Sequence, residues 1–318
     1  MYFKNKKILI AGGVGFVGNN LAITLRDLGA EVYATYFNNE PLVDKGIKFI
    51  KADLSNYNEC LEVCENKNLV YMCAANSSGA AVIENSPLAH FDPNLIMNIN
   101  MLRASHNSSV DKFIFISSNT VYPVTDYPVT EDDVNNTFFE KYHIVGWMKR
   151  FGEISCDIYS NRINNAMSTL VIRPGNLYGP YDKFDPEKSK VIPSLIRKIA
   201  NREFPLQVWG DGNDIKDFIY IDDFIDGLLK ATEKSKFYDI FNICGGQSVT
   251  IKDVINNLLK IEKLSNAEVY YDITKPTMIP LRLISGEKAK NEIDFVAKTS
   301  LQVGLKKTID WYKKNNDC

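Results

Sequence analysis

The first half of the chain alternates short apolar runs with amphipathic stretches. The apolar runs predict buried strands at 6–12, 31–37, 47–53, 68–74, 112–118 and 168–174. Segments long enough for helices lie between most of them, for example 16–29 and 93–108. Strands and helices in alternation predict an α/β protein, with a parallel sheet that carries helices on both faces. A later run, 241–246, predicts one more strand that returns to this sheet.

The residue composition of the chain changes after Pro174. Residues 175–217 are rich in Gly, Pro and Asp and contain a predicted helix at 191–201. The C-terminal pattern predicts helices at 250–262 and 301–314, with a short strand near 267–271. These elements predict a second, smaller lobe of mixed α/β type. We expect it to consist of 175–217 and 247–318, and we expect the larger domain to consist of 1–174 with a returning segment near 218–246.

Composition agrees with a folded, water-soluble chain. The chain has 318 residues, of which 45% are hydrophobic and 24% are charged, so disorder is excluded as its main state. The formal net charge of −2 argues against a general electrostatic attraction to nucleic acid or to anionic lipid. The N-terminus leads from a short basic stretch directly into a strand, without the apolar region of a signal peptide. We therefore expect a cytoplasmic protein with no nucleic-acid or membrane partner.

The cysteines and histidines do not predict a metal site. The 6 cysteines include no C-x-x-C pair, and the sequence has only 3 histidines. Cys60 and Cys64 are separated by one helical turn. We expect free thiols in a reducing compartment and no bound metal.

The strongest local signal is the run from Gly12 to Gly18, which follows a predicted strand and opens a predicted helix. Gly12 permits a tight turn, Gly15 lets backbone N–H groups approach a pyrophosphate, and Gly18 lets the helix pack closely on the strand. The N-terminus of the helix would then hold the anion. This arrangement favours a dinucleotide site and a Rossmann-type, doubly wound sheet, although a purely structural turn is the alternative.

Further motifs follow this turn along nearly the whole chain. They are Asp53-Leu54, Cys73-Ala74-Ala75, the spaced Asn94 and Asn100, Ser117 to Tyr122 (SSNTVY), Arg173 to Pro180 (RPGNLYGP) and Asp222-Asp223. Together with the glycine turn, they resemble the extended short-chain dehydrogenase/reductase family, in its NAD-dependent epimerase/dehydratase group that acts on nucleotide sugars.

The resemblance implies a set of cofactor-binding residues. Asp53 and Leu54 would contact the adenine, and the alanines would lie beside a ribose. The implied set is Gly12, Gly15, Phe16, Val17, Gly18, Asp53, Leu54, Ala74, Ala75, Asn100, Lys149, Pro174 and Asn176.

The second predicted strand bears on the choice between NAD and NADP. An acid at its end would accept the ribose hydroxyls of NAD and repel the phosphate of NADP. Here Thr35-Tyr36-Phe37-Asn38 provides neither an acid nor an arginine. The missing acid favours NADP slightly and the missing arginine weakens that preference, so both cofactors stay open.

The second half of the chain is similar to the GDP-fucose synthase branch of this family. The similarity implies substrate contacts by Asn176, Lys190, Val191, Leu195, Lys198, Trp209, Lys216 and Arg282. The basic members Lys198, Lys216 and Arg282 could neutralise a diphosphate, and Trp209 could offer a flat apolar face. Taken singly, each is better explained as a surface basic residue or a core tryptophan, and only their joint register favours a site.

The sequence departs from the family at its acid–base pair, a tyrosine and a lysine four residues apart on one helix. Lys149 occupies the lysine position, but the tyrosine position is Val145, which has no proton to transfer. Tyr142 precedes Val145 by about one turn. On one continuous helix, Tyr142, Val145 and Lys149 would share a face, so the Tyr142 hydroxyl could replace the missing one. Alternatively, Tyr142 is a packed or solvent-facing residue.

Two other family features are absent. Thr120 and Lys190 occupy the positions at which the fucose-synthase branch has its epimerising cysteine and histidine. Asn119-Thr120 also replaces the Asp-Glu pair of the sugar 4,6-dehydratases. Double epimerisation is therefore in doubt, and dehydration is not expected.

The resemblance predicts an NAD(P)-dependent oxidoreductase that transfers hydride at C4 of a nucleoside-diphosphate sugar, in the synthesis of cell-surface glycan or deoxysugar precursors. Its catalytic residues would be Ser118, Thr120, Tyr142 and Lys149. The alternatives are a nucleotide-sugar epimerase, and a binding protein that has lost catalysis. We also expect a homodimer formed by the helices near 93–108 and 139–160, since the second carries apolar residues around most of its circumference.

Overall fold

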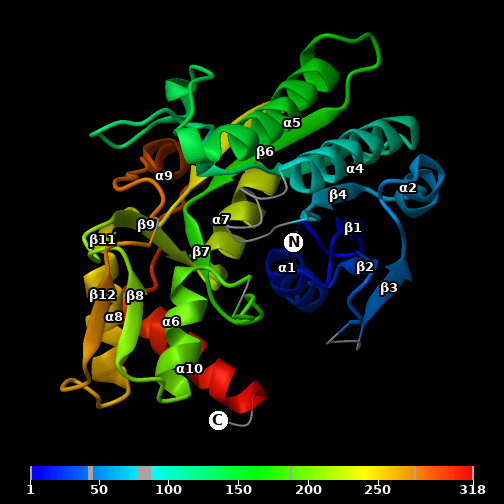
Figure 1. Ribbon diagram of the computed structural model, residues 1–318. Coiled ribbons are helices and arrows are strands. Elements are labelled where there is room, and N and C mark those ends of the chain that lie inside the picture. Colours follow the sequence, from blue (N-terminus) through cyan, green and yellow to red (C-terminus); the bar gives the residue numbers. More distant parts are fainter. Residues whose placement is uncertain (1, 42–45, 77–86, 187, 276, 317–318) are drawn as a thin grey trace.

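The computed structural model describes residues 2–41, 46–76, 87–186, 188–275 and 277–316, and its main feature is a seven-stranded sheet (Figure 1). The strand order is β10-β6-β5-β4-β1-β2-β3, and all neighbours are parallel. The strands are β1 (Lys7–Ala11), β2 (Glu31–Tyr36), β3 (Ile47–Lys51), β4 (Leu69–Met72), β5 (Lys112–Ile116), β6 (Ser168–Pro174) and β10 (Tyr238–Ile243). This is a Rossmann-type doubly wound sheet, so the predicted fold class is confirmed.

Apolar side chains on both faces of the sheet explain why these segments form central strands. In β1, Ile8, Leu9 and Ile10 are all buried, and successive side chains point to opposite faces. Ile8 and Ile10 belong to one apolar cluster, and Leu9 belongs to a second cluster across the sheet. The core therefore has two layers, one on each side of the sheet.

Helices cover both faces of the sheet, as the alternating pattern predicts. The helices α1 (Phe16–Asp27) and α7 (Ile221–Lys234) contribute to the first apolar cluster. The helices α2 (Tyr57–Cys64), α4 (Pro87–Asn107) and α5 (His143–Asn161) contribute to the second, and α4 and α5 lie side by side in Figure 1. The helix α4 begins at Pro87, nearly two turns before its predicted start near 93, and Pro93 is accommodated inside it.

Smaller sheets and helices form the remainder (Figure 1). A three-stranded sheet has the order β11-β9-β7, and a two-stranded sheet pairs β12 with β8. The strands of these two smaller sheets are β7 (Asn176–Tyr178), β8 (Leu206–Trp209), β9 (Ile215–Tyr220), β11 (Ser248–Thr250) and β12 (Val269–Asp272). The helices of this part of the molecule are α6 (Val191–Ala200), α8 (Ile251–Ile261), α9 (Glu287–Ile293) and α10 (Leu301–Asn315). The predicted strand at 241–246 corresponds to β10 at the edge of the large sheet.

One helix prediction needs correction. The segment 139–160 is not one α-helix, because residues Glu140–Tyr142 form a 3-10 turn, η3, and α5 begins at His143. Tyr142 is the N-cap of α5, with φ −104° and ψ 2°. It therefore does not extend the helical face that carries Val145 and Lys149. Two more 3-10 turns, η1 (Asn119–Val121) and η2 (Glu131–Asp133), lie between β5 and α5.

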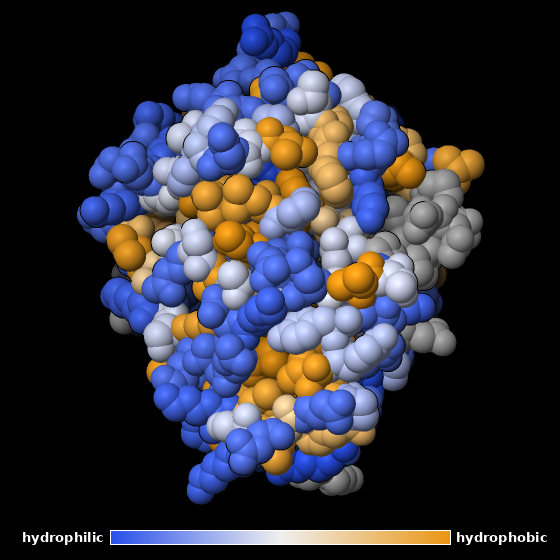
Figure 2. Space-filling model, turned by 60° about the vertical axis from the view of Figure 1, so that its left-hand side comes forward, coloured by the Kyte–Doolittle hydropathy of each residue, from blue (hydrophilic) through white to orange (hydrophobic). Residues whose placement is uncertain are grey.

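The surface is mixed in character. Figure 2 shows small apolar patches separated by charged and polar side chains on one face of the molecule. Among the described helices, none is both long enough and apolar enough to cross a bilayer. The described cysteines, Cys60, Cys64, Cys73, Cys156 and Cys244, are all free, and Cys318 lies outside the described residues.

Candidate active site

The carboxyl ends of the central strands bring the sequence motifs to one edge of the sheet. Gly12 follows β1, Cys73 follows β4, Ser117 follows β5 and Gly175 follows β6. The chain reverses its direction of winding between β1 and β4, and the crevice at such a point is where open α/β sheets bind ligands.

The glycine turn after β1 is shaped by close backbone packing. Gly12 has φ +80°, and its N–H donates to the hydroxyl of Thr35 over 2.9 Å. A Cβ on Gly18 would lie 2.2 Å from the carbonyl oxygen of Gly12, so only glycine lets α1 approach the turn this closely. Gly15 is the N-cap of α1 and makes no side-chain cap hydrogen bond. The N–H groups of the first helical turn, at Phe16 and Val17, thus remain for an anion.

The turn fits a dinucleotide on this evidence. A Cβ on Gly12 would lie 2.6 Å from the Cα of Ala74, so the turn lies against the end of β4 and leaves no room for a side chain between them. A backbone surface of this kind can approach a pyrophosphate closely. Ala75, next along the chain, is exposed.

The end of β3 is tied to α4. Asn100 donates from Nδ2 to the carbonyl oxygens of Leu54 (3.3 Å) and Ser55 (2.9 Å). Leu54 is buried, and Asp53 accepts from the backbone N–H of Ser55 over 2.9 Å. The structure therefore brings Asn100, Asp53 and Leu54 together, with Asn100 acting on the backbone.

Asn94 has a similar backbone role after β4. Its side chain accepts from the N–H of Asn76 over 2.8 Å and donates to the carbonyl oxygens of Asn76 and His90. It thereby fixes the described part of the chain beyond Ala75 on α4.

Lys149, on α5, reaches the end of β5. Its ammonium donates to the carbonyl oxygen of Ile116 over 2.8 Å and lies 5.1 Å from the ring centroid of Phe115. Burial lowers the pKa of Lys149 to about 8, although the Cys73 thiol and the Glu153 carboxylate act in the opposite direction. Lys149 is thus an amine with a titration near neutral pH at the sheet edge.

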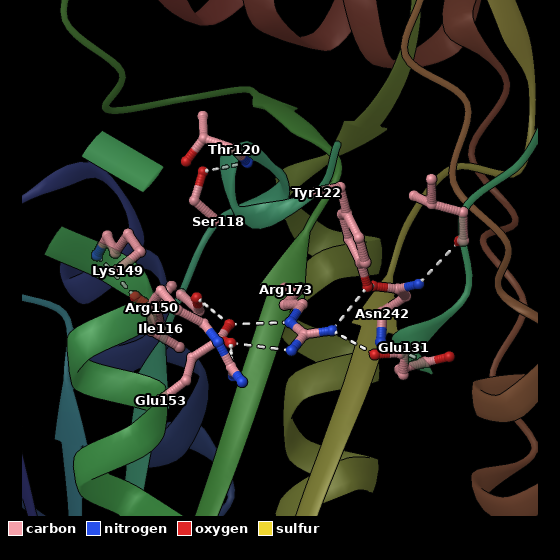
Figure 3. A network of polar contacts seen from close by, with 12 residues as sticks. Ile116, Ser118, Thr120, Tyr122, Glu131, Lys149, Arg150, Glu153, Arg173 and Asn242 are labelled. Atoms are coloured by element: carbon pink, nitrogen blue, oxygen red, sulfur yellow. Dashed lines mark hydrogen bonds and ion pairs between the residues drawn. The ribbon is translucent and has the colours of Figure 1, made fainter. Parts of the chain in front are cut away.

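A buried network fixes α5 against the sheet (Figure 3). Glu153 is 0% exposed and Arg173 is 1% exposed. Arg173, on β6, forms two bonds to the Glu153 carboxylate (2.8 and 2.9 Å) and a third to the hydroxyl of Tyr122 (3.0 Å). Glu153 lies one helical turn after Lys149, so this ion pair sets the rotation of α5 that directs Lys149 toward Ile116.

Ser118 and Thr120 lie on and beside the η1 turn, close to the same strand end (Figure 3). The hydroxyl oxygen of Ser118 accepts from the N–H of Thr120 over 3.2 Å. The Thr120 hydroxyl is buried without a hydrogen-bond partner in the described part of the chain. Each hydroxyl thus retains hydrogen-bonding capacity at the sheet edge.

Tyr142 faces a different set of groups. Its hydroxyl accepts the backbone N–H of Ile279, and burial raises its pKa to about 12 despite the nearby Arg282 guanidinium. The groups that act on its titration are Arg282, Asp214 and Ile279, all in the C-terminal half of the chain. The structure therefore associates Tyr142 with the segment around Ile279 instead of with Lys149.

Asn176 and Pro174 follow the same strand end as the network. Pro174 is the last residue of β6, and its carbonyl oxygen accepts from the side chain of Asn119 over 3.0 Å. Asn176 opens β7 and donates to the backbone carbonyl oxygen of Asp217 over 3.0 Å. Both are therefore fixed by protein contacts.

The implied substrate residues on α6 differ in exposure. Lys190 is the exposed N-cap of α6, and Val191 is 38% exposed, whereas Leu195 is buried in the core. Lys198 donates to the carbonyl oxygen of Gln207 over 2.8 Å, which ties α6 to β8. Leu195 and Lys198 thus have packing or bonding partners within the protein.

The remaining implied substrate residues also differ. Trp209 is 52% exposed at the end of β8, with the Lys275 ammonium 6.0 Å from its ring centroid. Lys216 bonds to the carbonyl oxygen of Ile279 and pairs with Asp214. Trp209 is therefore the member of this pair with a free apolar face.

Arg282 is buried and only partly satisfied. Its guanidinium donates to the carbonyl oxygens of Pro123 (2.8 Å) and Tyr122 (3.2 Å), while its Nε has no partner among the described residues. The structure brings Arg282, Lys216 and Tyr142 to one region through the segment around Ile279.

Two buried titratable residues beside this site belong to none of the sequence motifs. His90, on α4, is 5% exposed, and its Nδ1 has no partner among the described residues. Burial and the Lys149 ammonium both lower its pKa. Asp217, on β9, accepts the N–H groups of Gly245 (2.7 Å) and Gly246 (2.8 Å), and burial raises its pKa to about 7. Neither residue lies in a motif with a recognisable spacing, so only the fold reveals them.

Several known proteins are similar to this chain over nearly its full length. GDP-L-fucose synthase 1 of Arabidopsis thaliana is 28% identical over 322 residues, which cover 98% of this chain and 94% of the relative. The dTDP-4-dehydro-6-deoxy-D-allose reductase of a Streptomyces species is 25% identical, with coverage of 97% and 96%. Among solved structures, the UDP-glucuronic acid 4-epimerase of Bacillus cereus, in complex with UDP-glucuronic acid and NAD, has a TM-score of 0.85 at 25% identity and coverage of 97% and 99%.

The NAD dependent epimerase/dehydratase family matches residues 8–244, which include every strand of the large sheet apart from the first residue of β1. This chain belongs to the NAD dependent epimerase/dehydratase family.

Proposed function

We propose that this protein is an NAD(P)-dependent nucleotide-sugar oxidoreductase that transfers hydride at C4 of a nucleoside-diphosphate keto-sugar. The observation that carries the proposal is the meeting of the glycine turn, Ser118 and Lys149 at one edge of the large sheet. Relatives named as keto-sugar reductases and synthases cover nearly the full chain and support the reaction type.

The residues divide into three groups in this proposal. The cofactor would lie against Gly12, Gly15, Phe16, Val17, Gly18, Asp53, Leu54, Ala74, Ala75, Asn100, Lys149, Pro174 and Asn176. The sugar nucleotide would be held by Asn176, Lys190, Val191, Leu195, Lys198, Trp209, Lys216 and Arg282. Ser118, Thr120, Tyr142 and Lys149 are the candidates for acting on the reacting oxygen. Accordingly, residues 1–174 with 218–246 would form the cofactor domain, and 175–217 with 247–318 the sugar-nucleotide lobe.

The chain's own groups have separable tasks. The nicotinamide, when bound, gives or takes the hydride. Ser118 orients the C4 oxygen by hydrogen bonding, because its hydroxyl hydrogen is left over after its oxygen accepts from Thr120. The unpartnered Thr120 hydroxyl adds a second donor. The unpartnered Nε of buried Arg282 favours an acidic oxygen, such as one from a diphosphate, nearby.

The dinucleotide is NAD or NADP, and we favour NADP slightly. Tyr36 ends β2, and neither it nor the following Phe37 and Asn38 provides a carboxylate for the ribose hydroxyls of NAD. Titration of the protein with NADH and NADPH, followed by nicotinamide fluorescence, separates the two. Tighter binding of NADH than of NADPH would overturn this preference.

A nucleotide-sugar epimerase is the second candidate, favoured by the likeness to the Bacillus cereus 4-epimerase. A binding protein without catalysis is the third, and Val145 is the residue that favours it, since it replaces the family's proton donor. An epimerase would return its nicotinamide to the starting redox state, whereas a reductase would oxidise it stoichiometrically.

We also propose a homodimer through α4 and α5. Trp147, Phe151, Ile154 and Ile158 form one stripe on α5, and each is between 38% and 45% exposed. Their spacing of four, three and four residues is that of a helix–helix contact. Met148, on the same helix, does not belong to this stripe, because it is buried and faces the core. Phe151→Glu should convert the dimer to monomer in sedimentation, whereas Ile273→Glu, at another exposed apolar position, should not. A wild-type monomer at micromolar concentration would contradict this proposal.

The test of the main function starts from the purified protein. We expect mass spectrometry to find a nicotinamide dinucleotide, a nucleotide sugar or both retained by it. With NADPH or NADH and a panel of nucleotide keto-sugars, we expect oxidation of the cofactor and reduction of the sugar at C4. Binding of neither cofactor would overturn the whole proposal. Binding without turnover for any sugar would favour the binding protein.

A further inference from the structure

The family's proton donor is missing at a defined place on α5. Val145 and Lys149 lie one turn apart inside this helix, whereas Tyr142 lies outside it as the N-cap. The Tyr142 hydroxyl accepts the N–H of Ile279 and lies near Arg282 and Asp214, away from the helical face that carries Lys149. The sheet edge therefore lacks a tyrosine hydroxyl at the position where the family has its acid, and another group must supply the proton.

The Lys149 ammonium is the titratable donor that the fold holds at this edge. Its bond to the Ile116 carbonyl oxygen, 2.8 Å long, places it at the end of the strand that leads to Ser118 (Figure 3). An ammonium has three N–H donors, and Ile116 is its only hydrogen-bond acceptor among the described residues. Two N–H groups are therefore left for groups that bind at the edge.

The surroundings keep this amine able to lose its proton. Burial lowers the pKa of Lys149 to about 8, and the neighbouring His90 imidazole is itself held in its neutral form by burial and by Lys149. Glu153 and the Cys73 thiol are the groups that would favour the ammonium. The Glu153 carboxylate is already bonded to Arg173 and Arg150, which reduces its effect on Lys149.

We propose that Lys149 itself is the general acid of the reaction and passes its proton to the C4 oxygen, directly or through one water in the space that a tyrosine would fill. This inference rests on the proposed reductase function and assigns its proton source. It gives Lys149 a second task beside anchoring the cofactor, and it makes Val145 compatible with catalysis.

The C4 carbon would gain the hydride that the reduced nicotinamide supplies, and the nicotinamide would thereby be oxidised. The electron pair of the C4=O π bond moves onto the oxygen. The oxygen takes a proton from Nζ, one N–H bond breaks, and Lys149 remains as a neutral amine. A proton from the bulk solvent, which the net reduction consumes, then restores the Lys149 ammonium. In the reverse direction the neutral amine accepts the proton of the C4 hydroxyl.

The decisive variant is Lys149→Arg. Arginine keeps the positive charge and the donors toward Ile116 and the cofactor, but its guanidinium does not release a proton near neutral pH. We expect kcat for sugar reduction to fall by about 10²-fold or more, while the dissociation constant of the dinucleotide changes by less than about threefold. We also expect the wild-type rate of reduction to decrease as the pH rises through about 8, since the acid form is lost there. This limb should be absent in Lys149→Arg.

Lys112→Arg is the matched control. Lys112 is also a partly buried lysine and lies on β5, the strand of Ile116, but it is at the amino end of β5, where it donates to the carbonyl oxygen of Thr232. Its replacement should leave kcat and the pH profile unchanged.

A measurement on the wild-type protein does not depend on any variant or on turnover. NMR titration of ¹³C-labelled lysines, with the Lys149 signal assigned by its loss in Lys149→Arg, should give a pKa near 8. A pKa of Lys149 above 10, or a Lys149→Arg enzyme with an unchanged rate and pH profile, would overturn the inference but not the reductase function. Turnover lost in Tyr142→Phe but kept in Lys149→Arg would assign the proton to Tyr142 instead. Absence of dinucleotide binding in the wild type would overturn both proposals.

Discussion

The sides of the site that we propose for the cofactor and for the sugar nucleotide are built in different ways. On the cofactor side, backbone groups and glycines define the shape, and a Cβ on Gly12 or Gly18 would collide with neighbouring main chain. On the sugar side, long polar side chains define it. Lys198 on α6, Lys216 on β9 and Arg282 in the loop before α9 each already bond to a backbone carbonyl oxygen of the protein.

This difference makes the cofactor side the fixed side of the site and the sugar side the variable side. A backbone cradle can accept only the shape of a pyrophosphate, whatever chemistry follows. A set of charged side chains held by carbonyl oxygens can be re-aimed or substituted at lower cost, so it can change the sugar or the reaction. The α5 helix joins the two sides. Glu153 and Lys149, inside the helix, belong to the fixed side, and Tyr142, its N-cap, belongs to the variable side.

The largest effect is expected where the fixed side is anchored. Glu153→Ala leaves the Arg173 guanidinium buried without its carboxylate, and breaking a buried pair of this kind costs about 3–5 kcal/mol. Urea unfolding should show this loss. Lys306→Ala, which removes an exposed ion pair with Asp310, should change the free energy of unfolding by no more than about 1 kcal/mol. A small loss in Glu153→Ala would mean that the pair does not hold α5 in place.

The glycine turn should show the next largest effect. A Cβ in Gly18→Ala would be 2.2 Å from the Gly12 carbonyl oxygen, so backbone must shift at a cost of about 3 kcal/mol. The shift should also weaken dinucleotide binding at least about tenfold. Gly29→Ala is a suitable control for a strained backbone without a collision, because Gly29 has a positive φ (+81°) and its Cβ would meet only the Lys4 side chain at 3.5 Å. It should cost about 1–2 kcal/mol and leave cofactor affinity unchanged.

Removal of the Lys149 charge should have a moderate effect of opposite sign. The lowered pKa means that the folded protein holds this proton less tightly than the unfolded chain, which costs stability below about pH 8. We expect Lys149→Met to raise the free energy of unfolding by about 2 kcal/mol at pH 7, after the lost bond to Ile116 is deducted. The gain should shrink as the pH rises from about 8 toward 10.5, where the unfolded lysine also loses its proton.

Urea unfolding of the wild type and of Lys149→Met at pH 7 and pH 10 tests this. Lys306→Met, at an exposed position, should show no comparable dependence on pH. A difference between the wild type and Lys149→Met that is equal at both pH values would contradict a lowered pKa.

The same contrast decides how much of this molecule is predictable from its sequence. The large sheet, α1 and the glycine turn follow from local patterns, because apolar runs and glycines act within a few residues. The family resemblance also located Lys149 and Ser118. In contrast, the helix prediction failed at Tyr142, because the segment around Ile279, far away in sequence, binds its hydroxyl where a 3-10 turn precedes α5.

Long-range partners also explain the other omissions. His90 and Asp217 are single residues without a motif, and their burial depends on elements distant in the chain. The strands β7, β9 and β11 have only short patterns of their own and form a sheet by pairing with one another. Local pattern therefore predicts the cofactor side well and the sugar side poorly.

The smallest effect is expected at Tyr142, where the two sides meet. Tyr142→Phe removes the hydroxyl that accepts the Ile279 N–H and leaves that N–H buried, at a cost of about 1–2 kcal/mol. If Lys149 supplies the proton, kcat in Tyr142→Phe should stay within about threefold of the wild type. KM for the sugar nucleotide should rise, because the Ile279 segment also positions Lys216. Steady-state kinetics with the dinucleotide saturating separates the two parameters. Val145→Tyr completes the test, since it restores the family's pair with Lys149: it should raise kcat and move the basic limb of the pH profile away from 8. A fall of kcat by about 10²-fold in Tyr142→Phe, with KM unchanged, would show that the variable side of the site supplies the proton after all.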